Sequence, residues 1–154
     1  MIENYILQDE SETLNFGSNI AALIKESDET IFEFHLQGDL GAGKTTLVRG
    51  VLRALGWNGS VKSPTYTICE EYEFDQFLIL HIDLYRTEID EDVEMLELNR
   101  SFDGKKIIFI EWPEKVEDKR LFNLRINMMH FENSRKIRII GDTILIEKLI
   151  KEDK

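Results

Sequence analysis

The sequence predicts an α/β fold in three layers, with a central parallel sheet and antiparallel edge strands. An aromatic and β-branched segment over residues 30–36 precedes a glycine-rich stretch, and apolar residues at helical spacing follow through residue 55. Two further runs, 77–82 and 105–111, are mostly apolar, which is typical of strands covered on both faces. No linker, repeat or low-complexity tract interrupts the chain, so we expect a single domain over residues 1–154.

The glycine-rich stretch, Gly-Asp-Leu-Gly-Ala-Gly-Lys-Thr over residues 38–45, matches the phosphate-binding loop (P-loop) pattern G-x-x-x-x-G-K-[ST] at each fixed position. Between a strand and a helix, its backbone N–H groups can form a concave nest that suits phosphate oxygens. Lys44 would reach the β- and γ-phosphates, and the Thr45 hydroxyl would bind Mg²⁺. We therefore expect a P-loop NTPase-like domain that holds a nucleoside triphosphate with Gly38, Asp39, Leu40, Gly41, Ala42, Gly43, Lys44, Thr45 and Thr46.

Turn and capping residues divide the remaining chain. Asp9, with Glu12 three residues later, predicts the start of an amphipathic helix that continues through Ile24. Turn formers over residues 57–65 predict a loop. The other expected elements are strands over 5–7, 66–74 and 77–82, a short helix over 88–98, a strand pair over 121–131 and 135–140, and a C-terminal helix capped by Asp142.

Three side chains outside the loop are candidates for chemistry on a nucleotide. Asp83 and Glu111 each end an apolar strand, so both should lie at the carboxyl edge of the sheet, where ligands of open α/β sheets bind. Asp83 is expected to order Mg²⁺, and Glu111 either to complete magnesium binding or to orient water. Thr65, in the loop after the helix, is expected to sense the γ-phosphate. The predicted metal ligands are therefore Thr45, Asp83 and Glu111, and the predicted catalytic residues are Glu111, Asp83 and Thr65.

Charge and composition argue against several classes of protein. A formal net charge of −11 argues against a protein that holds nucleic acid by itself, because phosphate neutralisation needs a basic face. The basic residues between 119 and 138 indicate either a surface for an acidic partner or the solvated side of two strands. The single cysteine, Cys69, is interpreted as a strand residue. Since no stretch is long and apolar enough to span a bilayer and the N-terminus lacks a basic signal-peptide start, we expect a cytoplasmic protein with no membrane association.

Four motifs occur in a fixed order along the chain. They are the loop at 38–46, Ser-Pro-Thr-Tyr-Thr at 63–67, His-Ile-Asp-Leu-Tyr-Arg at 81–86 and Glu-Trp-Pro-Glu at 111–114. Together they resemble the TsaE (YjeE) family of small bacterial ATPases, which are required to make threonylcarbamoyladenosine in transfer RNA. The resemblance is specific over residues 34–114 and weak in the part of the chain that follows.

The resemblance implies ATP as the nucleotide and Mg²⁺ as its metal. It also implies a partnership with the TsaD and TsaB proteins, in which TsaD transfers the threonylcarbamoyl group and ATP turnover supports repeated cycles. Transfer RNA would then be contacted indirectly, through these partners. By motif position Trp112 would belong to the partner-facing or catalytic rim, and Thr13 and Arg135 would approach the nucleotide.

Other functions remain open from the residues alone. A small P-loop kinase of a nucleoside or metabolite would close an arginine-rich lid over the phosphates, but only Arg86 lies near the motifs. A GTPase would need the base-reading sequence Asn-Lys-x-Asp, which the chain lacks. A nucleotide-dependent interaction module, with incidental hydrolysis, is the third possibility. Because no internal arginine finger is evident, we expect an ATPase that is weak alone and stimulated by its partners.

Overall fold

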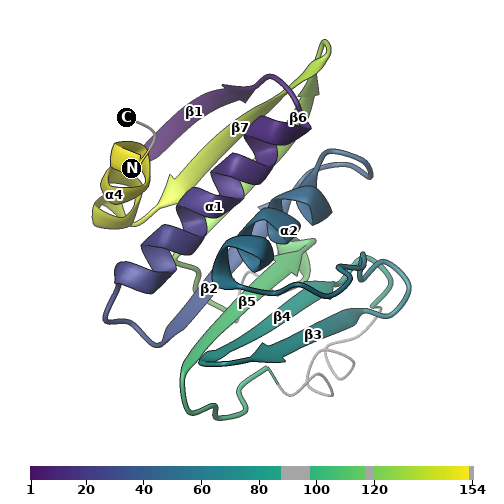
Figure 1. Cartoon of the computed structure of the whole chain (residues 1–154). Coiled ribbons are helices and arrows are strands. Elements are labelled where there is room, and N and C mark those ends of the chain that lie inside the picture. Colours follow the sequence, from purple (N-terminus) through teal and green to yellow (C-terminus); the bar gives the residue numbers. More distant parts are fainter. Residues whose placement is uncertain (88–97, 117–119, 153–154) are drawn as a thin grey trace.

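The computed structural model describes residues 1–87, 98–116 and 120–152 (Figure 1). Its seven-stranded sheet has the order β1-β7-β6-β2-β5-β4-β3. The strands are β1 (Ile2–Leu7), β2 (Ile31–Gln37), β3 (Cys69–Phe74), β4 (Phe77–Asp83), β5 (Lys105–Glu111), β6 (Leu124–Phe131) and β7 (Ser134–Gly141). The helices are α1 (Glu10–Glu26), α2 (Lys44–Leu55) and α4 (Thr143–Glu152), with a 3₁₀ turn η1 at Pro113–Lys115.

The sheet has the predicted parallel centre and antiparallel edges. β6, β2, β5 and β4 run parallel to one another, whereas β1 and β7 on one side and β3 on the other pair antiparallel. β4 and β5 are buried along nearly their whole length, as their apolar sequences predict. The carboxyl ends of β2, β5 and β4 consequently meet at one edge of the sheet.

Helices α1 and α2 lie side by side over one face of the sheet (Figure 1). Two glycines allow their backbones to touch. A Cβ added at Gly17 would lie 2.6 Å from the carbonyl oxygen of Leu47, and one at Gly50 would lie 2.5 Å from that of Leu14. Helix α1 is therefore held directly against the helix that follows the phosphate-binding loop.

A second, smaller apolar cluster lies on the opposite face of β4 and β5. The segments that cover these strands contribute Leu84, Leu98 and Val116 to it. The helix that we expected over residues 88–98 falls largely on residues 88–97, which lie outside the described part of the chain.

Two strands begin later than the sequence predicts. Residues 64–67 form a turn and not the start of the strand expected from Tyr66, because Ile68 has a left-handed φ of 69° and its carbonyl accepts from the N–H of Asp83 (2.8 Å). The strand expected from Leu121 begins at Leu124, after Asn123 exchanges hydrogen bonds with the backbone of Glu33. In both places a contact distant in sequence determines the local structure.

Asp9 and Asp142 start helices as predicted. The Asp9 carboxylate accepts from the N–H of Glu12 (2.9 Å), and that of Asp142 accepts from the N–H of Leu145 (3.0 Å). The Glu12 carboxylate accepts in turn from the N–H of Gln8, one residue before the cap. Within the described ranges, no helix combines the length and apolar character needed to cross a membrane.

Cys69 is the first residue of β3. The pKa of its thiol is raised to about 11, chiefly by burial and to a lesser extent by the nearby carboxylates of Glu71 and Glu70. The thiol therefore stays protonated at neutral pH, which fits a strand residue and not a nucleophile.

Candidate nucleotide-binding site

The phosphate-binding loop joins the end of β2 to the start of α2 and depends on its glycines. Gly38, Gly41 and Gly43 have φ values of 151°, 80° and 108°, a region that other residues rarely adopt. A Cβ on Gly38 would also lie 2.5 Å from the carbonyl oxygen of Met128 in β6. The loop thus directs the N-terminus of α2, with its free N–H groups, toward the adjacent cavity.

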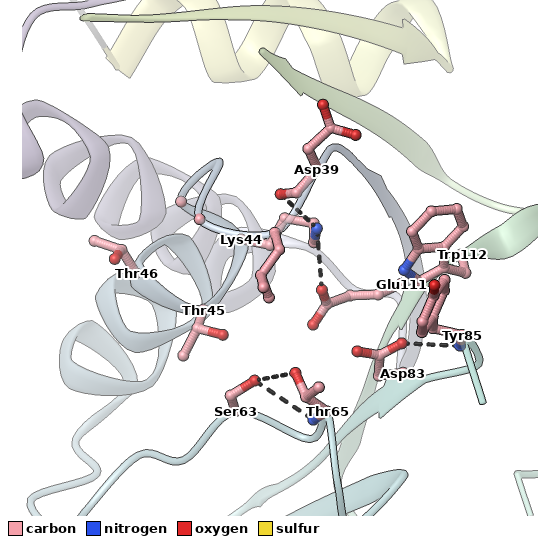
Figure 2. A pocket seen from close by; sticks show the side chains of 13 residues that line it. Asp39, Lys44, Thr45, Thr46, Ser63, Thr65, Asp83, Tyr85, Glu111 and Trp112 are labelled. Carbon is pink, nitrogen blue, oxygen red and sulfur yellow. Dashed lines mark hydrogen bonds and ion pairs between the residues drawn. The ribbon is translucent and has the colours of Figure 1, made fainter. Parts of the chain in front are cut away.

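A cavity of about 440 Å³ lies in front of this loop (Figure 2). Among the described residues, Lys44 is the one cation that lines it. The loop, the 63–65 segment and the ends of β4 and β5 supply its walls. They contribute Asp39, Leu40, Gly41, Gly43, Lys44, Thr45, Thr46, Ser63, Thr65, Asp83, Tyr85, Glu111 and Trp112.

Asp83 and Glu111 lie next to each other in the cavity wall. They are register partners at the ends of the parallel strands β4 and β5, so their side chains leave the same face of the sheet. Both are buried, with exposed fractions of 6% and 4%. The Asp83 carboxylate accepts from the N–H of Tyr85 (2.9 Å), which fixes one of its two oxygens. The register therefore brings together the two carboxylates that the sequence singled out.

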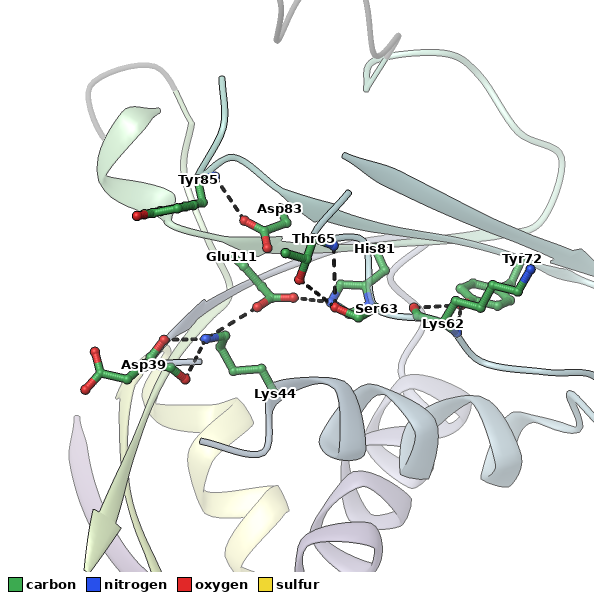
Figure 3. A network of polar contacts seen from close by, with 11 residues as sticks. Asp39, Lys44, Lys62, Ser63, Thr65, Tyr72, His81, Asp83, Tyr85 and Glu111 are labelled. Atoms are coloured by element: carbon green, nitrogen blue, oxygen red, sulfur yellow. Dashed lines mark hydrogen bonds and ion pairs between the residues drawn. The ribbon is translucent and has the colours of Figure 1, made fainter. Parts of the chain in front are cut away.

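Lys44 connects the loop to Glu111 (Figure 3). Its ammonium group donates to the carbonyl oxygens of Gly38 and Asp39, and it lies 3.5 Å from Oε1 of Glu111. The other oxygen of that carboxylate, Oε2, lies 2.7 Å from Nε2 of His81. Loop lysine, carboxylate and histidine thus form a continuous polar chain that runs from the cavity wall into the protein interior.

The segment after α2 forms the wall opposite Lys44 and Glu111 (Figure 2). The hydroxyls of Ser63 and Thr65 share a hydrogen bond of 2.7 Å, and both residues line the cavity. The N–H of Ile68 donates to the carbonyl of Pro64 (2.8 Å), which closes the turn that carries Thr65. The Thr65 hydroxyl accordingly faces the cavity from a short, internally bonded turn.

Thr13 and Arg135 line a second cavity, of about 180 Å³, which shares Gly41, Gly43 and Thr46 with the first. Thr13 is buried, on α1. The guanidinium of Arg135, on β7, donates to the carbonyl oxygens of Ala42 (3.0 Å) and Gly41 (3.3 Å). Both residues therefore lie beside the phosphate-binding loop.

The mouth of the larger cavity carries exposed apolar side chains. Leu40 at the tip of the loop is 86% exposed and Tyr85 is 58% exposed, and both line the cavity. The rings of Tyr85 and Trp112 pack together at a centroid distance of 4.8 Å, and Trp112 has a left-handed φ of 58°. We call Leu40, Tyr85 and Trp112, which all line the cavity, the apolar rim.

Oxygen donors of the kind that Mg²⁺ prefers line the cavity. These are the Thr45 hydroxyl and the carboxylates of Asp83 and Glu111. The described residues contain no group of three or more His, Cys, Asp or Glu side chains able to hold a metal. One hydroxyl and two carboxylates are a donor set of the kind that suits a cation which keeps several waters and binds phosphate, as Mg²⁺ does.

Sequence reasoning missed two features of the site. It did not indicate that His81 bonds Glu111 on the neighbouring strand. It also did not indicate that Arg135 supports the loop backbone. The spacing His-x-Asp puts His81 on the same strand face as Asp83, and so near Glu111, which was a signal for the first contact. The sequence held no signal for the contact of Arg135 with the loop.

The basic residues between 119 and 138 do not form one surface. Arg120 pairs with Glu33 and Arg135 with the loop carbonyls, while Lys119 lies outside the described residues. Lys136 and Arg138 are exposed and alternate along β7 with buried isoleucines, so they lie on the sheet face away from α1 and α2. Two of the basic side chains are thus structural.

Comparison with known sequences identifies the family. The sequence model of the family described as threonylcarbamoyl adenosine biosynthesis protein TsaE matches residues 7–139. The Haemophilus influenzae protein named tRNA threonylcarbamoyladenosine biosynthesis protein TsaE is 39% identical over 146 residues, which cover 94% of this chain and 92% of that protein. The Aquifex aeolicus protein of the same name is 37% identical over 141 residues, covering 90% and 96%.

The fold also has a solved counterpart. The crystal structure of Bacillus subtilis YdiB aligns with a TM-score of 0.72 at 24% identity, over 100% of this chain and 97% of that chain. This likeness supports the architecture, and the sequence matches extend beyond the four motifs into β6 and β7. The chain belongs to the TsaE family.

Proposed function

We propose that this protein binds ATP with Mg²⁺, hydrolyses the ATP to ADP and phosphate, and acts in the biosynthesis of threonylcarbamoyladenosine in transfer RNA. One observation carries the proposal. Lys44, Thr45, Asp83 and Glu111 line a single cavity in front of a complete phosphate-binding loop. The pathway follows from membership of the TsaE family.

The loop and its lysine would hold the phosphates. Backbone N–H groups at the start of α2 suit the anionic oxygens, and the Lys44 ammonium adds a charge-assisted hydrogen bond. Thr13 and Arg135, around the adjoining cavity, would lie along the rest of the nucleotide. Two cavities that share part of the loop as a wall suit a ligand with a polyanionic end and a bulkier end.

Hydrolysis needs an ordered metal and an oriented water. Mg²⁺, held by Thr45, Asp83 and Glu111 together with the phosphates, would neutralise the charge that develops during phosphoryl transfer. Glu111 has a second possible role, because a carboxylate in this wall can orient the attacking water. Thr65, on the facing turn, would contact the γ-phosphate and so distinguish ATP from ADP.

Partners would complete the site. Lys44 is the one cation among the described residues that line the larger cavity, so a charge donated by another protein would accelerate transfer. The apolar rim around the mouth is a suitable docking surface for TsaD and TsaB. With a net charge of −11, the chain would reach transfer RNA through these proteins and not by itself.

A small P-loop kinase is the alternative, and the position of Arg86 counts against it. Its guanidinium stacks over the ring of Tyr66 at 4.5 Å and does not line the cavity. A kinase would need arginines that close on the transferred phosphate, and no described residue of the cavity wall fills that role.

Titration calorimetry with ATP and Mg²⁺ tests binding. Lys44→Ala should weaken binding tenfold or more, because a charged hydrogen bond contributes about 1.5–3 kcal/mol. Lys148→Ala, a substitution on the exposed side of α4 away from both cavities, is the matched control and should bind as the parent does. Equal affinity of a folded Lys44→Ala variant would refute the assignment.

Steady-state hydrolysis tests the rest of the proposal. The chain alone should turn over slowly, and addition of TsaD and TsaB together should raise the rate severalfold or more. Fast turnover that is indifferent to both partners would favour the kinase, as would phosphate transfer to a nucleoside or metabolite in place of release to water.

A further inference from the structure

We propose that His81 is the positioning residue for Glu111, and that it keeps one carboxylate oxygen fixed while phosphate binding frees the other from Lys44. This inference rests on the proposed ATPase function and concerns how Glu111 becomes available to metal or water. It explains why a histidine lies behind the cavity, where it touches none of the space that a nucleotide would fill.

The hydrogen bond between His81 and Glu111 is buried and well defined. The His81 side chain is fully buried, and its Nε2 lies 2.7 Å from Oε2 of Glu111. An ionised carboxylate can only accept, so Nε2 carries the proton and donates it. Edge-on packing against Phe109, at 6.4 Å between ring centroids and 75° between planes, fixes the orientation of the imidazole.

The backbone holds the two groups at this spacing. His81 is the register partner of Phe109, and Asp83 is the partner of Glu111. Glu111 is therefore the diagonal neighbour of His81 on the next strand, within reach of a long side chain. Because both strands lie in the buried parallel centre of the sheet, neither end of the hydrogen bond can move without disturbing the core.

The opposite oxygen of Glu111 is held by a weaker interaction. Oε1 lies 3.5 Å from Nζ of Lys44, longer than an ordinary N–H···O hydrogen bond. A lysine ammonium has three donors, and Lys44 already faces three acceptors: two loop carbonyls and this carboxylate. A phosphate oxygen bound by Lys44 must displace one of the three, and the long contact to Glu111 is the one most easily given up.

Phosphate binding and the release of Oε1 are therefore coupled. While Lys44 faces Glu111, Oε1 is neutralised by the ammonium group. When Lys44 binds a phosphate oxygen instead, Oε1 becomes available to a metal ion or a water, while Oε2 stays bound to His81. The histidine thus prevents the freed carboxylate from following the lysine and keeps it directed at the reacting phosphate.

Kinetics of three variants test this role, with both partners present. His81→Leu should bind ATP within about threefold of the parent yet lower kcat by about 10- to 100-fold, the usual loss when an outer positioning group is removed. His81→Gln retains a donor near the position of Nε2 and should recover most of the rate. His35→Leu is the matched control, because His35 is an equally buried strand histidine bonded to a glutamate, Glu33 (2.9 Å), and its loss should leave kcat unchanged.

A double mutant separates positioning from general packing. If His81 acts through Glu111, His81→Leu should cost no further rate in a Glu111→Gln background. If the two losses multiply, or if His81→Leu turns over at the parent rate, the inference is wrong. A parent protein that hydrolyses no ATP with its partners would instead refute the proposed function.

Nuclear magnetic resonance of the histidine ring gives a test that needs no turnover. The Nε2 proton of His81 should appear as a protected downfield signal that is absent from His81→Gln and shifted in Glu111→Gln. It should persist when Mg²⁺ and ADP, or a non-hydrolysable ATP analogue, are added. Loss of this signal on nucleotide binding would overturn the proposal whatever the rate of hydrolysis.

Discussion

Arg120→Met should destabilise the fold strongly at neutral pH. Arg120 forms a buried ion pair with Glu33 in β2. Its guanidinium donates to the two carboxylate oxygens at 2.8 Å and 2.7 Å. Nε2 of His35 lies 2.9 Å from one of the same oxygens. Glu33 is only 8% exposed, so without the guanidinium its charge would be left inside the protein with His35 as the remaining partner.

The cost follows from what remains in the core. Removing one partner of a buried ion pair typically costs about 3–5 kcal/mol, and we expect the lower end because His35 remains. Burial alone would raise the pKa of Glu33, but hydrogen bonds from His35 and Arg120, with the positive charge of Arg120, hold it below its ordinary value. The pair therefore stabilises the fold above the unfolded-state pKa of glutamate, and this contribution disappears as the pH falls through the folded-state pKa.

Urea unfolding of parent and Arg120→Met, at neutral pH and at pH values below the ordinary glutamate pKa, measures the effect. The difference in unfolding free energy should be about 3 kcal/mol at pH 7 and should shrink in acid, where the stranded carboxylate becomes protonated. Adding Glu33→Gln should recover most of the loss, because it removes the buried charge. A loss under about 1 kcal/mol at pH 7, or a double variant as unstable as the single one, would refute the reasoning.

Three further variants test the site and the helix pair. Glu111→Gln should bind nucleotide but lower the partner-stimulated ATPase rate about 10²-fold or more, in a steady-state assay; a parent-like rate would remove Glu111 from the mechanism. Trp112→Ala should reduce stimulation by TsaD and TsaB more than it weakens ATP binding, since Trp112 lies in the apolar rim. Gly17→Ala should lower the thermal midpoint at a cost of about 1–3 kcal/mol, because its Cβ would meet the α2 backbone 2.6 Å away; Ser18→Ala, one position along α1, is its control.

Features that depend on short sequence patterns could be predicted from the sequence. The phosphate-binding loop and the two carboxylates at strand ends follow from spacing alone, because parallel strands must bring their carboxyl ends to one edge. The left-handed conformation of Ile68 could not be predicted, since β-branched residues rarely adopt it and it depends on a hydrogen bond from Asp83. The contact of Arg135 with the loop spans 93 residues, and no local rule reaches that far.

The Arg135 contact has a consequence for which side chains position 135 can accept. A trans peptide is planar, with its C=O and N–H on opposite sides, so a guanidinium that anchors the carbonyl of Ala42 turns the N–H of Gly43 the other way. The guanidinium contacts two successive carbonyls through a planar, rigid fork, whereas a lysine ammonium is a compact group on a flexible stem and would hold the two peptides less firmly. A change to lysine would conserve the charge yet permit peptide flips in the loop, so purifying selection here should act on shape as well as on charge.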